Sequence, residues 1–297
     1  MRSVYKHPGG RDAVRRWCSD ALERADLPHI RAAVDTGAGR VELTSAGTGP
    51  LRVVVLPGTG FNAAVLLPWL EALSTRWATT VVDLPGQPGL SDPHRPRGDR
   101  TTWYGRVVDE VLEAIGADGV VLVGDSLGAA VALAAGSSRI AARVLVSPAG
   151  IVRLRVDPQL ALTSAGWLLR PSTATTRRML RAFVAPGADP PDTEVEWMTL
   201  VARCCRTTLA PPPLPAALLA QRADQPCVVA VAVGEHDRFL PPHRLAPAVR
   251  RTMNVELRVL RGAGHLITSA DLHAVVSLVA DAVGLTGQHR STDRYDA

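Results

Sequence analysis

The sequence predicts an α/β fold: a mostly parallel, twisted sheet flanked by helices, with an inserted helical cap. Two observations predict it. Short apolar runs typical of buried strands recur along the chain, and helical patterns follow most of them, which is the alternation of a parallel sheet covered on both faces. This alternation is interrupted once, by a long segment that has helical patterns only.

The N-terminal part is expected to lie outside the sheet. Residues 12–25 have the pattern of an amphipathic helix, and we assign residues 1–31 to an N-terminal helical extension. Residues 32–46, in which Gly37 and Gly39 mark a turn, predict an antiparallel hairpin that leads into the core.

The core is predicted to comprise residues 32–151 and 223–285. Its remaining strands are expected at residues 51–56, 79–84, 120–123, 143–146, 228–233 and 255–260. The helical segment at residues 152–222 is predicted to be the cap, or lid, inserted into this core. Residues 286–297 are polar and are expected to form a flexible tail.

Composition and charge narrow the class of partners. Hydrophobic residues make up 46% and charged residues 21% of the 297 residues, with a net charge of +5, as in soluble globular proteins. The arginines are scattered and no basic run is interleaved with aromatic residues, so we expect no nucleic-acid partner. The first residues lack the apolar core of a secretion signal, and no long uninterrupted apolar stretch follows, which predicts a cytoplasmic protein without a membrane partner. The sequence does not indicate the oligomeric state.

The four cysteines predict neither a metal site nor a disulfide framework. They form no C-x-x-C pair and no cluster with histidines at ligand spacing. Cys204 and Cys205 are adjacent, which is too close for a relaxed disulfide. We therefore expect reduced cysteines, and no metal or cofactor.

A serine lies between two glycines where a predicted strand meets a predicted helix, in VVLVGDSLGAAVALAA. Gly124, Ser126 and Gly128 fit the pattern G-x-S-x-G, in which the serine occupies a sharp turn and the glycines leave room for close strand-helix packing. A turn serine that caps the following helix would give the same letters. The strand before the turn and the helix after it favour a nucleophile. Asp125 is expected to be a polar turn residue that faces away from the substrate.

A serine nucleophile needs a base, and the base needs an orienting carboxylate. Both residue types follow in that order. Asp237 lies in GEHDRFLPP after one predicted strand, and His265 lies in RGAGHLI after another. Because open α/β sheets build their sites at the carboxyl ends of their strands, we expect Ser126, Asp237 and His265 to meet there.

These motifs resemble those of the α/β-hydrolase superfamily, in particular its serine hydrolases and esterases with a helical cap. The resemblance extends over about residues 39–284. GDSLG is similar to the family's nucleophile turn, GEHDRFLP to its acid loop G-x-x-D-x-x-x-P, and GAGH to its histidine turn. VVDLPGQPGLSD resembles the family's D-x-P-G-x-G-x-S loop, with its spacing shifted at Pro88 and Gly89, and Pro57 stands where relatives generally have histidine.

The resemblance implies an enzyme that cleaves a carboxylic ester, or a related acyl bond, of a small molecule through an acyl-enzyme intermediate. Ser126 attacks the carbonyl, His265 takes its proton and passes it to the leaving group, and Asp237 orients the imidazole. The same residue types also fit three alternatives: an acyltransferase, thioesterase or cyclase of natural-product biosynthesis, a carbon-carbon bond hydrolase, and a ligand-binding protein without turnover.

The resemblance also implies an oxyanion hole, built from the backbone N–H groups of Thr59 and Leu127. Substrate contacts are expected from the loop at Thr59 and from the cap. The predicted substrate-binding residues are Gly60, Phe61, Trp167 and Trp197.

Three other hypotheses remain open at this point. GTGFNA fits G-x-G-x-x-A, and Asp83 at the end of the next strand could then contact a dinucleotide ribose. Glu235 could replace Asp237 as the orienting acid. Three arginines on one predicted cap helix could bind an anionic group or face solvent; they are Arg177, Arg178 and Arg181.

Overall fold

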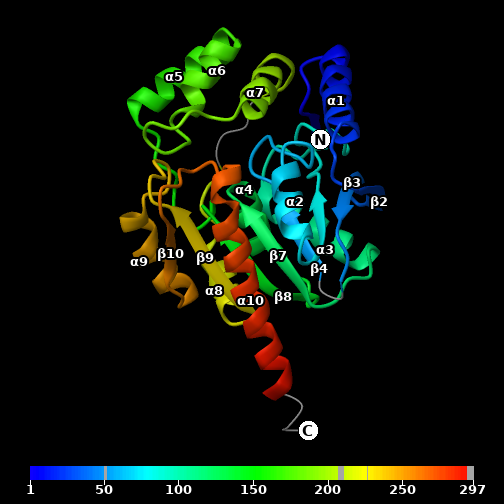
Figure 1. Ribbon diagram of the computed structural model, residues 1–297, viewed down its shortest axis with the longest axis vertical. Helices are drawn as coiled ribbons and strands as arrows, with labels where there is room; N and C mark the ends of the chain where they lie inside the picture. Colours follow the sequence, from blue (N-terminus) through cyan, green and yellow to red (C-terminus); the bar gives the residue numbers. More distant parts are fainter. Residues whose placement is uncertain (50–51, 207–210, 226, 293–297) are drawn as a thin grey trace.

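The computed structural model describes residues 1–49, 52–206, 211–225 and 227–292, the last six of these by their backbone only (Figure 1). Its centre is an eight-stranded sheet in the order β10-β9-β8-β7-β4-β5-β3-β2. The strands are β2 (Ile30–Thr36), β3 (Gly39–Ala46), β4 (Arg52–Leu56), β5 (Ala78–Val82), β7 (Val120–Asp125), β8 (Ile140–Val146), β9 (Val228–Gly234) and β10 (Leu257–Leu260).

The predicted mostly parallel sheet is confirmed. β2 pairs antiparallel with β3, and β3 antiparallel with β5, whereas β5, β4, β7, β8, β9 and β10 are parallel neighbours. The ends of the strands differ from the prediction by at most three residues, and Leu51 lies outside the described residues. β8 begins at Ile140, three residues earlier than expected, because Ile140 pairs with Val120. A separate two-stranded ladder joins β1 (Arg2–Ser3) to β6 (His94–Arg95).

Two layers of helices cover the sheet because successive strand side chains point to opposite faces. In β4, Val53 and Val55 pack toward α2 (Leu67–Ser74) and α10 (Leu272–Thr292), together with the N-terminal α1 (Pro8–Glu23). Val54 and Leu56 pack toward the opposite layer. That layer consists of α3 (Arg100–Ala114), α4 (Leu127–Ala134), α8 (Ala216–Ala223) and α9 (Pro242–Met253).

α1 starts four residues before the predicted helix. Pro8 occupies the first turn, where its missing N–H costs nothing, and the Nδ1 atom of His7 accepts a hydrogen bond of 2.9 Å from the N–H of Gly10. The sequence did not indicate this earlier start because histidine is an uncommon N-cap residue.

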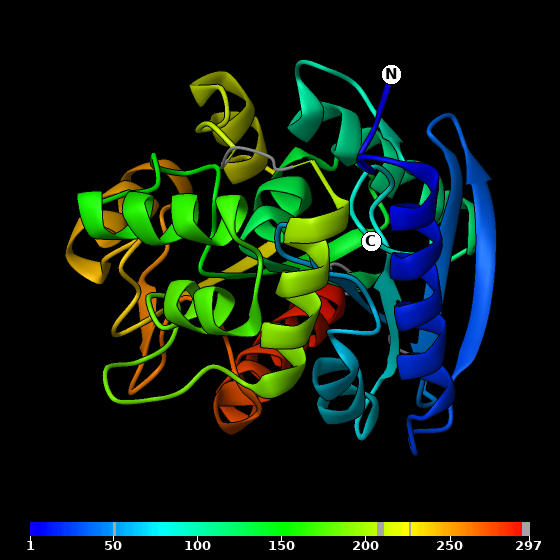
Figure 2. The same ribbon diagram turned by 90° about the horizontal axis from the view of Figure 1, so that it is seen from above.

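In the described part of the segment between β8 and β9, four helices are inserted. α5 (Pro158–Leu169), α6 (Thr173–Leu180) and α7 (Asp192–Cys204) pack on one another over the carboxyl ends of the parallel strands (Figures 1 and 2). α1 lies beside α7, with the rings of Trp17 and Trp197 4.7 Å apart. The fourth helix, α8, packs instead on α4 and α9, and Arg222 donates hydrogen bonds to the carbonyls of Leu133 and Ala134. α8 is thus part of the inserted segment, but it packs on the core rather than over the strand ends.

α10 is the last helix and extends to Thr292, into the segment expected to be a tail; residues 293–297 lie outside the described residues. By length and composition, Ser269–Thr286 would suffice to cross a membrane, with a mean hydropathy of 1.2. Its apolar stripe, which includes Leu272, Val275 and Val279, is buried against the sheet. The packing on the sheet thus accounts for the apolar character of this helix.

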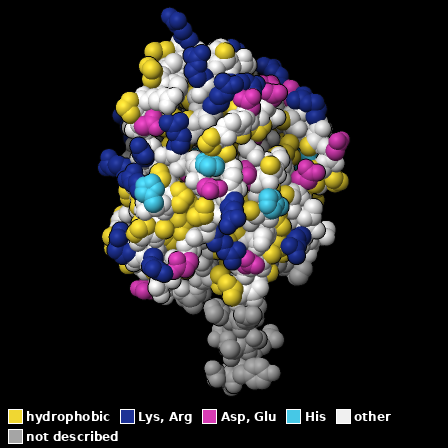
Figure 3. Space-filling view, turned by 60° about the vertical axis from the view of Figure 1, so that its left-hand side comes forward, with side chains coloured by type: hydrophobic (Ala, Val, Ile, Leu, Met, Phe, Trp, Pro, Cys, Tyr) yellow, Lys and Arg dark blue, Asp and Glu magenta, His cyan; other side chains and the backbone are white. Residues whose placement is uncertain are grey.

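On the face drawn in Figure 3, the described basic side chains lie interspersed with acidic and apolar ones.

Candidate active site

The serine between glycines lies on a tight turn from β7 into α4. Ser126 has φ 49° and ψ −105°, a strained conformation for a residue with a side chain. A Cβ atom on Gly128 would lie 1.9 Å from the carbonyl oxygen of Leu56, and one on Gly124 would lie 2.5 Å from backbone atoms of Ala129. The glycines are required because α4 starts directly against the sheet, and this geometry lifts Ser126 above the strand ends.

Three of the predicted site residues are joined by hydrogen bonds. The Oγ atom of Ser126 is 3.1 Å from Nε2 of His265, and Nδ1 of His265 is 2.7 Å from Oδ2 of Asp237. Oδ1 of Asp237 accepts bonds of 2.9 Å from the N–H groups of Phe239 and Leu240. Asp237 is therefore fixed by the turn on which it sits, and its free oxygen holds the imidazole with Nε2 facing the serine.

The electrostatics of the pair favour a strong base. Burial alone would raise the pKa of Asp237, but attraction to His265 and hydrogen bonds to the carboxylate hold that pKa below its usual value. Burial alone would lower the pKa of His265, but the carboxylate of Asp237 outweighs it and raises that pKa. Each group thus stabilises the charged form of the other, which is the state reached when the imidazole takes the serine proton.

The other two carboxylates considered from the sequence have different partners. Glu235 is half exposed and accepts a bond from the N–H of Gly262 rather than contacting the imidazole. Asp83 is buried, and its two oxygens accept the N–H groups of Ala63 and Leu90 at 2.7 and 3.0 Å. Burial raises the pKa of Asp83 to about 6. With both oxygens engaged by its own loops, Asp83 is not placed to bind a ribose.

The predicted oxyanion donors lie on two sides of the serine turn. Leu127 begins α4, and neither its N–H nor that of Thr59 donates to another described residue. Gly60 has φ 79°, its N–H donates to Gln87, and its carbonyl accepts a bond of 2.8 Å from Nε1 of Trp197. Gly60, predicted to touch substrate, has both backbone groups occupied in holding the loop that presents Thr59.

A cavity of about 180 Å³ lies at Ser126 and His265. Phe61, a predicted substrate residue, lines it. Six further apolar side chains complete the wall: Leu154, Leu180, Phe183, Met198, Phe239 and Leu266. α6 and α7 thus supply part of an apolar chamber over the serine.

The two tryptophans predicted to bind substrate lie outside the wall of this cavity. Trp197 is fully buried against Trp17, and Trp167 donates from Nε1 to the carbonyl of Met198 at 3.1 Å. Both instead fix α7, whose Met198 reaches the chamber. Helical spacing marked the buried face of this segment, but it could not tell which buried residues meet the cavity.

Two contributors to the site were missed from the sequence. The ring of Phe239 packs at a tilt against that of His265 with centroids 4.7 Å apart, and Phe183 meets the same imidazole edge-on at 5.9 Å. Phe239 stands two residues after Asp237 in the acid loop, so its proximity to the base was a usable signal.

Asp125 differs from its expected role as a turn residue facing away from the substrate. It borders the cavity, is 8% exposed, and its Oδ1 has no partner among the described residues. Burial raises the pKa of Asp125 to about 7, while His265 opposes and Asp237 reinforces that shift.

The structure also bears on cofactors and on the arginine cluster. In the described ranges, no three His, Cys, Asp or Glu side chains gather in a way that could hold a metal ion. Arg177 of α6 pairs with Asp192, and Arg181, which directly follows α6, pairs with Asp189 at 3.0 Å. These two cations are thus already paired within the inserted helices.

Comparison with known proteins places the chain in a family. Residues 53–278 match the sequence profile described as the alpha/beta hydrolase family. The chain belongs to this family. No curated protein matches it in sequence.

Solved structures share the α/β-hydrolase fold. Carboxylesterase CesB from Bacillus subtilis superposes with a TM-score of 0.76 at 16% identity, over 93% of this chain and 98% of that one. Naproxen esterase from the same organism gives 0.74 at 17% identity, over 91% and 97%. An esterase from Exiguobacterium antarcticum gives 0.69 at 17% identity, over 86% and 100%. The expected fold, with helices inserted into a mostly parallel sheet, is confirmed.

Proposed function

We propose that this α/β hydrolase cleaves a small carboxylic ester through an acyl-enzyme intermediate. The observation that carries the proposal is the hydrogen-bonded series from Ser126 through His265 to Asp237, with Ser126 facing an apolar cavity. A serine hydroxyl becomes a competent nucleophile when a positioned base can take its proton. Similar folds in proteins named carboxylesterase and esterase support the same reaction class.

In the first half of the reaction, Ser126 attacks the ester carbonyl while Nε2 of His265 takes the hydroxyl proton. The charge that develops on the carbonyl oxygen is stabilised by the N–H groups of Leu127 and Thr59. The imidazolium then donates its proton to the alkoxide, and the alcohol leaves. In the second half, His265 takes a proton from water, which attacks the acyl group and releases Ser126 and the acid.

Labelling with a fluorophosphonate probe, followed by intact-mass spectrometry, tests this proposal. We expect one adduct on the wild type, and none on Ser126→Ala or His265→Ala. Ser74→Ala, which changes a half-exposed serine at the end of α2, should label like the wild type. An adduct on Ser126→Ala, or its absence from a folded wild type, would contradict the assignment.

A further inference from the structure

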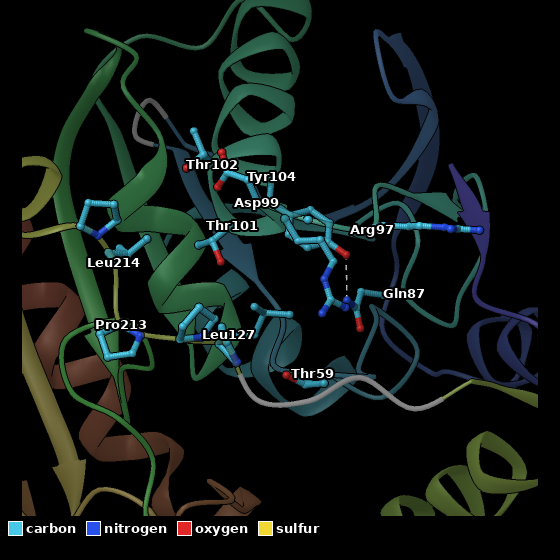
Figure 4. A pocket seen from close by; sticks show the side chains of 15 residues that line it. Thr59, Gln87, Arg97, Asp99, Thr101, Thr102, Tyr104, Leu127, Pro213 and Leu214 are labelled. Carbon is cyan, nitrogen blue, oxygen red and sulfur yellow. Dashed lines mark hydrogen bonds between the residues drawn. The ribbon is translucent and has the colours of Figure 1, made fainter.

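A second cavity, of about 170 Å³, shares the lining residue Thr59 with the first, and Figure 4 shows the side chains around it. Its wall contains Thr59 and Leu127, the candidate oxyanion donors, but neither Ser126 nor His265. The remaining wall comes from Gln87, the start of α3 and the segment 211–215. This cavity therefore borders both residues whose N–H groups are the candidate oxyanion donors, and it is separate from the serine and the base.

The N-terminus of α3 opens into this second cavity. The N-cap residue Asp99 has φ 41°, and its side chain makes no capping hydrogen bond. The first turn of this 15-residue helix contains no acidic residue, and the N–H groups of Arg100, Thr101 and Thr102 have no acceptor among the described residues. Uncapped N–H groups and the helix dipole favour a negatively charged occupant.

A hydroxyl on the cavity wall points to a ligand independently of the helix end. Thr101 is only 9% exposed, and its Oγ1 has no hydrogen-bond partner in the described part of the chain. Figure 4 shows this hydroxyl directed toward Leu127. Thr101 lines the cavity, and its hydroxyl is not one of the enclosed, unpartnered side-chain atoms of the described residues, so it can donate to an acceptor on a molecule bound there.

Tyr104 supplies a second donor. Its phenol oxygen accepts a bond of 2.8 Å from Nε2 of Gln87, which leaves the phenol proton to be donated (Figure 4). Burial raises the pKa of Tyr104, against the opposing influence of the nearby Arg95 and Arg100. Tyr104 therefore keeps its proton.

The charge of the wall has the sign that an anion requires. Arg97 and Arg100 both line the cavity, and neither forms an ion pair within the described residues. Figure 4 shows Arg97 extending away from Thr101, so this arginine adds positive charge only at the edge of the cavity. Asp99 is the one acidic residue among the described lining residues, and it is exposed. Arg177 of α6 and Arg181 directly after it, in contrast, are neutralised by partners.

We propose that this second cavity binds a carboxylate at the far end of the acyl chain, so that the substrates are half-esters of dicarboxylic acids. The inference rests on the proposed esterase function. The leaving oxygen must reach Nε2 of His265, which places the alcohol in the apolar cavity. The acyl chain then extends past Thr59 and Leu127 toward Arg100 and Thr101. Hydrolysis adds water across the ester C–O bond and releases a neutral alcohol, a dicarboxylate and one proton.

The test compares benzyl half-esters of succinic, glutaric and adipic acid with the corresponding terminal amides, which have the same length but no charge. Benzyl alcohol is quantified by chromatography. For at least one chain length, we expect kcat/KM of the acid to exceed that of the amide by about tenfold or more. This ratio should fall between about 20 mM and about 500 mM NaCl because salt screens the attraction.

Two variants probe the cavity. Arg100→Gln should reduce the acid-to-amide ratio of kcat/KM at least about fivefold, and Thr101→Val at least about threefold. Arg181→Gln, which changes a surface arginine directly after α6, is the matched control and should leave the ratio unchanged. Thermal unfolding of each variant verifies that it is folded.

The failure of this inference is distinguishable from that of the esterase proposal. An enzyme that reacts with the fluorophosphonate but hydrolyses acids and amides equally at every length overturns the carboxylate site alone. If the enzyme neither hydrolyses the esters nor reacts with the fluorophosphonate, the esterase proposal fails. Binding of a carboxylate in the second cavity is then tested by the effect of glutarate on the melting temperature. If glutarate raises the melting temperature of Ser126→Ala, and this rise is lost when Arg100→Gln is added, the carboxylate site is supported. If glutarate does not raise the melting temperature, or if only inorganic phosphate does, the site is overturned.

Discussion

Replacing Asp237 by asparagine tests the orientation of the imidazole. Oδ1 of Asp237 accepts two backbone N–H groups, so the amide oxygen of the introduced side chain has to take that position. The NH₂ group then faces Nδ1 of His265, which must accept and therefore loses its proton to Nε2. A protonated Nε2 donates to Ser126 instead of accepting from it, and the base is lost.

The expected loss in kcat is about 10⁴-fold, or about 5.5 kcal/mol of transition-state stabilisation. The assay is hydrolysis of p-nitrophenyl butyrate at saturating substrate, with urea unfolding to verify the fold. Glu235→Gln is the matched control, because Glu235 precedes Asp237 by two residues and contacts Gly262 rather than His265; its rate should stay within about twofold of the wild type. A loss below about tenfold for Asp237→Asn, or equal losses in both variants, would refute the reasoning.

Three further predictions concern backbone fit and pH. Gly128→Ala should lower the free energy of unfolding by about 2 kcal/mol or more, because its Cβ would meet the carbonyl of Leu56 at 1.9 Å. Gly166→Ala, in a helix with no atom near its Cβ, should stabilise slightly, and similar values for the two variants would count against tight packing at the turn. Burial raises the pKa of Asp125 to about 7, so the folded state retains a proton that the unfolded chain has released above about pH 4. The free energy of unfolding should then fall as pH rises from 4 to 7, by about 4 kcal/mol from this group, and Asp125→Asn should remove that slope in urea titrations; parallel curves would disprove it. Since Asp237 raises the pKa of His265 despite burial, kcat/KM should increase with pH through a midpoint above 6.5, and a midpoint well below that value would mean that another group is titrating.

The sequence predicted the strands and the three central site residues because their signals are local. Ser126, Asp237 and His265 each lie within five residues of the end of a strand, and the carboxyl ends of parallel strands must meet at one edge. Chain order and turn chemistry were sufficient to bring them together.

The inserted helices and the second cavity depend on long-range partners, which one sequence does not reveal. Periodicity marks Trp197 as buried, but its neighbour is Trp17 of α1, far away along the chain. Similarly, Arg100 and Thr101 look like an ordinary helix start, and they line a cavity only because residues 211–215 return beside them. α8 lies in the same inserted segment as α5, yet it packs on α4 and α9 of the core.

The hydrogen bond from Trp197 to Gly60 restricts how the chamber can admit a molecule. α7 is fastened through this indole to the loop that presents the N–H of Thr59, and on its other side it is supported by α1. If all the inserted helices moved together as one rigid lid, α7 would displace the loop at Gly60 each time the chamber opened. We therefore expect α7 to stay in place when a substrate enters, and α5 and α6 to be the helices that move. The N–H groups of Thr59 and Leu127 would then keep their positions while the chamber opens.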